Sequence, residues 1–273
     1  MQGGPKRGCA VVDELKSARA KLARARTVFA EFDQIAAPWR KARSYKRVIT
    51  VEPATGEEVH KLVRITSIPE QLEQIAADVV GNLRAALDQA AYAVATAATS
   101  SGKFAQFPIA ETFDDVEQMN LPKGKSRAIP AGIFQVMTSF KPYRGGNNLL
   151  WALHELSNCD KHRITREIKR SNNSRRLDLF VEDGSVRRGM TVPQPPLIWG
   201  SDQEELEILR IKTWGAARYR SSIAVALTFG DLDDLSWMPV EAVLTELAAL
   251  VEQILDAIEA QAVRESLFTS AAA

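Results

Sequence analysis

Apolar residues recur at alternating steps of four and three in the first part of the chain, the pattern of a long helix packed against another helix. The positions are Val11, Leu15, Ala18, Leu22, Ala25, Phe29, Phe32 and Ala36. Pro38 is expected to end this helix, because the residue before a proline disfavours helical geometry. We therefore predict a helix over residues 11–37.

Two further long helices follow from similar apolar stripes. One covers residues 68–99, where Ser67 and Glu70 have the spacing of a capping box. Its stripe is rich in alanine, so a neighbouring helix can approach closely. The other covers residues 239–268 near the end of the chain.

Shorter helices are predicted between the long ones. Residues 148–161 form the most regular of them, with Asn147 or Asn148 as its N-terminal cap. Two more short helices are expected at residues 113–119 and 130–140.

Runs of β-branched residues predict strands. Residues 45–51 and 59–65 flank a Pro/Gly turn and read as a hairpin. Further strands are expected at residues 176–181, 185–190, 206–211 and 222–229.

Together these elements predict an α+β fold. It consists of a bundle of long helices with an antiparallel β-sheet, formed mainly by residues 164–230 and by a hairpin at 44–66. No repeat or low-complexity linker divides the chain, so we expect one domain over residues 9–268. Residues 1–8 and 269–273 are expected to be flexible ends.

The near-neutral net charge of +1 hides an uneven distribution. Between residues 6 and 47 there are twelve Lys or Arg and four Asp or Glu, and a second basic stretch runs over 161–176. This asymmetry permits a nucleic acid or another polyanion as partner. The alternative is that these are solvated helix faces, balanced by acidic neighbours in the fold.

Composition also bears on compartment. The hydrophobic share of 45% argues against wholesale disorder, and no apolar run approaches the roughly 20 residues that cross a bilayer. Cys9 and Cys159 are too far apart in sequence to indicate a disulfide framework. A cytoplasmic protein with no membrane segment is the expectation.

The segment around the fourth predicted helix holds the candidate chemistry. On a helical wheel, Asp160 falls in the middle of a side otherwise lined by leucines and Ile164. A carboxylate there needs donors or a cation, so Asp160 is a candidate functional group. The alternative is that the helix is ending and Asp160 accepts bonds from Lys161, Arg163 or a neighbouring strand.

His154, Asn158 and His162 are spaced by four and line one stripe beside that apolar side, with Trp151 and Glu155 next to them. Successive members lie about 6 Å apart and the ends about 12 Å. The two histidines therefore cannot ligate one metal ion unaided, and no metal is expected. The stripe can bracket a phosphate or ribose, or supply a general base; the alternative is that each histidine makes only structural hydrogen bonds.

Several catalytic motifs are absent from the sequence. The segment from Lys123 to Ser126 lacks the first glycine of a phosphate-binding loop, and His154-Glu155 is not followed by a second histidine at metalloprotease spacing. No cofactor is indicated, and an enzyme is not favoured.

Four blocks of the chain resemble a family of uncharacterised bacterial proteins. They are residues 82–88, 107–109, 142–143 and 153–163, and the last, Leu-His-Glu-Leu-Ser-Asn-Cys-Asp-Lys-His-Arg, is the most specific. This resemblance implies a shared fold and no established activity.

More distantly, the helical arrangement is similar to the HEPN superfamily of RNA-binding and RNase domains, which are common in toxin and phage-defence systems. The HEPN pattern has an arginine, then a polar residue, then a histidine a few positions later. Asn158 and His162 match the last two, but Ser157 stands at the arginine position and Arg163 lies beyond the histidine. The resemblance therefore implies a degenerate, defence-associated relative that binds nucleic acid.

Three functions remain open. The first is an RNA- or nucleotide-binding protein that uses Trp151, His154, Asn158 and the residues from Lys161 to Arg163. The second is a non-catalytic interaction module that forms a homo-oligomer through the N-terminal helix. The third is a small-molecule hydrolase that uses Asp160 with His154 or His162.

Overall fold

The structure is a computed structural model of the 273-residue chain. It describes residues 15–41, 45–159, 168–180, 198–199, 204–212, 218–229, 232, 235 and 238–269.

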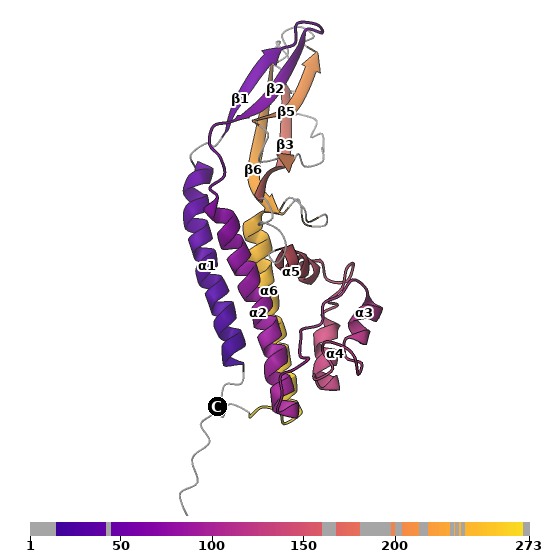
Figure 1. The fold of residues 1–273 in the computed structure, drawn as a ribbon. Helices are drawn as coiled ribbons and strands as arrows, with labels where there is room; N and C mark the ends of the chain where they lie inside the picture. Colours follow the sequence, from indigo (N-terminus) through magenta and orange to yellow (C-terminus); the bar gives the residue numbers. More distant parts are fainter. Residues whose placement is uncertain are drawn as a thin grey trace, which may run out of the picture. The chain divides into compact units, whose positions relative to one another are not determined.

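The described elements follow one another as helices, a hairpin, more helices, strands and a final helix (Figure 1). The helices are α1 (Lys16–Lys41), α2 (Gln71–Thr99), α3 (Phe113–Gln118), α4 (Ala131–Ser139), α5 (Asn148–Cys159) and α6 (Val240–Arg264). The strands are β1 (Tyr45–Val51), β2 (Glu57–Arg64), β3 (Ile168–Phe180), β4 (Ile198–Trp199), β5 (Glu205–Lys212) and β6 (Arg218–Phe229). The predicted α+β fold is confirmed.

The first helix ends later than the sequence predicts, because α1 passes through Pro38 and ends at Lys41. A proline removes one backbone donor, which a helix tolerates when its last turn is held from outside. Here the indole Nε1 of Trp39 donates to the carbonyl of Ser67 at 2.8 Å. Arg40 pairs with Asp33 at 2.9 Å and also with Glu241.

The predicted capping box of α2 is wrong. The helix begins at Gln71, four residues after Ser67, whose carbonyl already accepts the Trp39 bond. The chain enters α2 through a turn in which the amide of Leu72 donates to the carbonyl of Pro69 at 3.0 Å.

The chain divides into two compact units, and the expectation of a single domain stays a prediction. The first unit comprises residues 1–28, 78–158 and 245–273. Its core includes the alanine stripe of α2, where Ala86, Ala90, Ala91 and Ala95 are fully buried. In this unit α1 runs antiparallel to α6, since Arg19 pairs with Asp256 and Glu259 while Arg26 pairs with Glu252.

The second unit comprises residues 29–77 and 159–244 and contains the strands. The described strands form two three-stranded sheets, in the orders β1-β2-β5 and β4-β3-β6. The single sheet expected from residues 164–230 and the hairpin is therefore corrected to two sheets: β5 pairs with β2 of the hairpin, Leu62 opposite Leu206, and the other sheet contains β3, β4 and β6. Alternating residues in β5 do not specify a partner strand. The strand predicted at residues 185–190 lies outside the described residues.

The hairpin at 44–66 is confirmed, with Tyr45 opposite Arg64 and Val51 opposite Glu58. Gly56 closes its turn with a left-handed φ of 68° and donates its amide to the carbonyl of Glu52 at 2.9 Å. A glycine adopts this conformation without a steric penalty.

β2 carries His60, which is fully buried. A guanidinium nitrogen of Arg47 lies 2.8 Å from its Nδ1, and a Glu58 carboxylate oxygen lies 3.4 Å from its Nε2. Burial, followed by the positive charge of Arg47, lowers the pKa of His60, and Glu58 opposes this only in part. His60 is thus held neutral in the folded chain.

A pH dependence of stability follows from this lowered pKa. The unfolded chain binds the proton more tightly than the folded chain, so the free energy of unfolding should decrease as the pH falls through about 6.5. We expect urea midpoints to fall between pH 7.5 and 5.5, and less so in His60→Gln than in the wild type. Parallel curves for the two proteins would contradict a buried neutral imidazole.

Within the described residues, no helix combines the length and the apolar character needed to cross a membrane.

Candidate functional site

The start of α5 follows the sequence prediction. The side-chain oxygen of Asn147 accepts hydrogen bonds from the amides of Leu149 and Leu150, both at 3.1 Å. This is an N-terminal cap, which satisfies amides that have no partner inside the helix. The inner face of the helix is apolar, with Leu150 and Leu153 fully buried.

Part of the predicted site lies outside the described residues, namely Asp160, Lys161, His162 and Arg163. α5 is described as far as Cys159, two residues short of the predicted end at Lys161. The proposed roles of these four side chains stay predictions.

The structure brings together the other three predicted residues, Trp151, His154 and Asn158. The rings of Trp151 and His154 have centroids 5.3 Å apart and are tilted by 31°. The Nε2 atom of His154 lies 2.8 Å from the side-chain nitrogen of Asn158. Trp151 and His154 are half-buried and Asn158 is exposed, so this stripe reaches the surface of α5.

The contact between His154 and Asn158 has a chemical consequence. An amide nitrogen is only a donor, so Asn158 donates and His154 accepts at Nε2. A neutral imidazole then carries its proton on Nδ1. Nε2 is therefore engaged within the helix, and the indole of Trp151 lies beside the imidazole ring.

Ser157 Oγ donates to the carbonyl of His154 within the helix at 3.0 Å, and so it is not aligned as a nucleophile. Among the described residues, no group of three or more His, Cys, Asp or Glu side chains is placed to hold a metal ion.

Three arginines of the N-terminal basic cluster pair with acidic residues of the same chain. Arg26 makes two hydrogen bonds to Glu252, at 2.9 and 2.6 Å, and these bonds lower the pKa of Glu252. Arg19 and Arg40 are paired with acidic residues as well. For these three arginines, acidic neighbours in the fold therefore balance the positive charge, as the alternative interpretation of the sequence expected.

A polar cluster in α2 was not predicted from the sequence. Asp88 accepts hydrogen bonds from Arg84, at 3.2 and 3.1 Å, and from the amide of Phe107 at 3.0 Å. Arg84 in turn donates to the carbonyl of Phe107 at 3.1 Å. The two side chains thus bind the backbone carbonyl and the backbone amide of Phe107, and we call this arrangement the Phe107 clamp. Its signal was an Arg and an Asp four residues apart in an otherwise alanine-rich stripe.

The clamp also relates the blocks that carry the family resemblance. Residues 82–88 hold residue 107 through the clamp. Ala110 donates its amide to the carbonyl of Pro142 at 3.2 Å and pairs with Tyr143 in a parallel bridge. The first block thus contacts the second, and Ala110, which directly follows the second block, contacts the third.

Comparisons with models of known protein families, with curated proteins and with solved structures give no significant match for this chain. Neither the resemblance to the bacterial family nor that to the HEPN superfamily is tested by these comparisons. The functional argument therefore depends on the site itself.

Proposed function

We propose that the protein binds single-stranded RNA through the outer edge of α5, without cleaving it. The observation that supports this is the pairing of the Trp151 and His154 rings on a half-exposed stripe. Proteins that bind single strands combine aromatic platforms, on which bases stack, with cations that follow the backbone.

The residues that follow α5 fit the second half of that description. Lys161, Arg163 and Arg166 come directly after the stripe in sequence, and the basic stretch continues to residue 176. Phosphate contacts from them would make binding fall steeply with added salt.

Binding without cleavage follows from the chemistry of Ser157. It stands where the HEPN pattern has an arginine, and its hydroxyl bonds to the helix backbone. A neutral side chain used in this way cannot stabilise the charge that develops on a phosphate during transfer. We also propose that the protein is a relative of the HEPN superfamily in which Ser157 replaces the catalytic arginine.

The test is a titration of a fluorescein-labelled, 20-nucleotide RNA of mixed sequence, followed by anisotropy at low and moderate salt. Loss of one stacking platform costs about 1–3 kcal/mol, so Trp151→Ala should weaken binding roughly 5- to 150-fold. Trp151→Phe keeps an aromatic face and should retain most of the affinity. Arg24→Ala, an exposed change on α1, serves as the control.

Two outcomes would count against this function. One is the absence of RNA binding by the wild type at low salt. The other is equal affinity for RNA in Trp151→Ala and Arg24→Ala, which would place binding away from α5.

Oligomerisation through the N-terminal helix is a weaker proposal in light of the structure. Leu15, Leu22, Phe32 and Ala36 of the predicted seam are buried within the chain itself. They present no apolar face to a second copy. Hydrolysis by Asp160 with a histidine gains no support from the described residues.

A further inference from the structure

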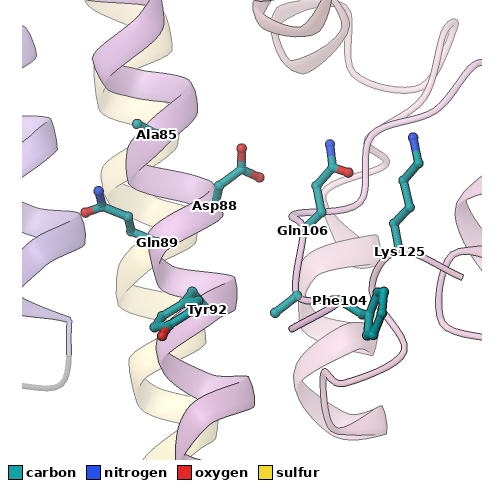
Figure 2. Close-up of a pocket in the computed structure, with 8 residues that line it drawn as sticks. Ala85, Asp88, Gln89, Tyr92, Phe104, Gln106 and Lys125 are labelled. Carbon is teal, nitrogen blue, oxygen red and sulfur yellow. The ribbon is translucent and has the colours of Figure 1, made fainter. Parts of the chain in front are cut away.

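A hollow of about 620 Å³ lies between α2 and the segments around residues 104–106 and 125, all within the first unit (Figure 2). Its volume falls in the range typical of small-molecule sites, about 300–1,000 Å³. Asp88 and Gln106 extend into the space between α2 and the facing segment, whereas Gln89 points away from it. The sequence analysis did not single out any of these residues.

Two aromatic rings line the hollow and remain open to solvent. Tyr92 is 56% exposed and Phe104 is 53% exposed. Phe104 has a left-handed φ of 61°, a conformation that a bulky side chain adopts only at a cost. The carbonyl of Phe104 accepts a bond from Ala128 at 3.2 Å, and the Arg127 guanidinium lies 3.2 Å from its ring centroid. The surroundings therefore hold this exposed ring in place.

Asp88 contributes a hydrogen-bond acceptor to the hollow. Its Oδ1 accepts from Arg84 and from the amide of Phe107, and among the described residues its Oδ2 accepts only from Arg84. A carboxylate oxygen has two lone pairs, so Oδ2 keeps the capacity for one more donor. Its side chain is 38% exposed, which leaves that capacity accessible to a ligand.

Gln106 and Lys125 complete the polar lining. The main chain of Gln106 is fixed, because its amide donates to the carbonyl of Lys125 at 3.2 Å and its carbonyl accepts from Ser126 at 2.6 Å. Its carboxamide oxygen can serve as a second acceptor for a ligand in the hollow. Among the residues that the structure describes, the Lys125 ammonium takes part in no ion pair.

We propose that this hollow is a binding site for a guanine nucleotide. The planar base lies against Tyr92 and Phe104, where every base can stack through its π-face. The adjacent N–H groups of the guanine edge donate to Asp88 Oδ2 and to the Gln106 carboxamide. The phosphate is attracted to Lys125. This site lies on α2 and does not depend on the RNA-binding role of α5.

A free guanine nucleotide and the 5′-phosphorylated end of an RNA strand both supply a guanine base with a phosphate. Saturation-transfer difference NMR titrations with GMP, IMP, UMP and a 5′-phosphorylated guanine trinucleotide distinguish the cases. We expect GMP to bind more tightly than IMP, which lacks only the 2-amino donor, and than UMP. A tighter trinucleotide assigns the hollow to a strand end, and a tighter GMP assigns it to a free nucleotide.

Two variants probe the lining of the hollow. Lys125→Gln should weaken GMP roughly two- to fivefold, as expected for an exposed charge pair, and should leave guanosine unchanged. Tyr92→Leu should weaken both ligands roughly tenfold, because a stacking face is lost. Lys123→Gln is the matched control, since Lys123 is an exposed lysine two residues away that does not line the hollow. Circular dichroism melts confirm that each variant folds.

The proposal is overturned if GMP gives no saturable signal at millimolar concentration, or if inorganic phosphate displaces it completely. It is also overturned if GMP binds to Tyr92→Leu and Lys125→Gln as it does to the Lys123→Gln control. Trp151→Ala should leave GMP binding unchanged, so failure of the RNA-binding proposal and failure of this one are distinguishable.

Discussion

Replacing Phe107 by alanine is expected to lower the free energy of unfolding by about 3–5 kcal/mol, the largest effect of any change considered for this protein. The ring is fully buried, so its removal loses the transfer free energy of the side chain and leaves a cavity. Urea denaturation followed by circular dichroism measures the loss. Phe107→Leu should cost much less, because it refills most of the volume.

Phe113→Ala provides the matched control for that experiment. Phe113 is 46% exposed and its ring makes an edge contact with that of Tyr143, with 5.7 Å between the centroids. We expect a loss of no more than about 1 kcal/mol. Equal losses at Phe107 and Phe113 would contradict the burial of Phe107.

Removing Asp88 should have the second largest effect, about 2–4 kcal/mol for Asp88→Ala. The variant leaves the guanidinium of Arg84 without its carboxylate, although Arg84 is only 9% exposed, and it leaves the amide of Phe107 without an acceptor. The expected loss of stability stays below the upper end of the range for broken buried ion pairs, because Asp88 is partly open to water. Urea midpoints measure this loss as well.

Asp88→Asn separates the two contributions. It keeps an acceptor for the Phe107 amide but removes the charge opposite Arg84, so an intermediate loss is expected. Asp78→Ala, an exposed acidic position on the same helix, should change stability by no more than about 0.5 kcal/mol. If Asp78→Ala and Asp88→Ala are equally stable, the Phe107 clamp contributes nothing to the fold.

Helix positions were predictable where the signal is local. The cap at Asn147 and the stripe of buried leucines in α5 both depend on residues within one or two turns of each other. The hairpin was predictable for the same reason, because Gly56 lies in a turn that joins strands adjacent in sequence.

The errors arose where a distant residue decides the outcome. α1 continues past Pro38 because Trp39 finds the carbonyl of Ser67, and no pattern within α1 contains that information. β5 joins the hairpin sheet through its pairing with β2, a choice between edges that alternating hydrophobicity cannot make.

The candidate site shows the same division. The proximity of Trp151, His154 and Asn158 follows from helical spacing alone, so it was predictable. The hollow beside Asp88 was not, because it requires the segment around Phe104 to fold back along α2 and the backbone of Phe104 to adopt a positive φ.

The ion pairs between α1 and α6 have a consequence for how these two helices recognise each other. Arg26 follows Arg19 by seven residues, and Glu252 precedes Glu259 by seven. In the antiparallel arrangement, these equal spacings allow the Arg19–Glu259 and Arg26–Glu252 pairs to form in the same alignment. A slip of four residues would place Arg19 opposite Leu255 or Val263 instead of Glu259. Surface pairs of this kind add little to stability. Here, however, they would disfavour shifted alignments of α1 against α6, which the leucine- and alanine-rich core alone would allow.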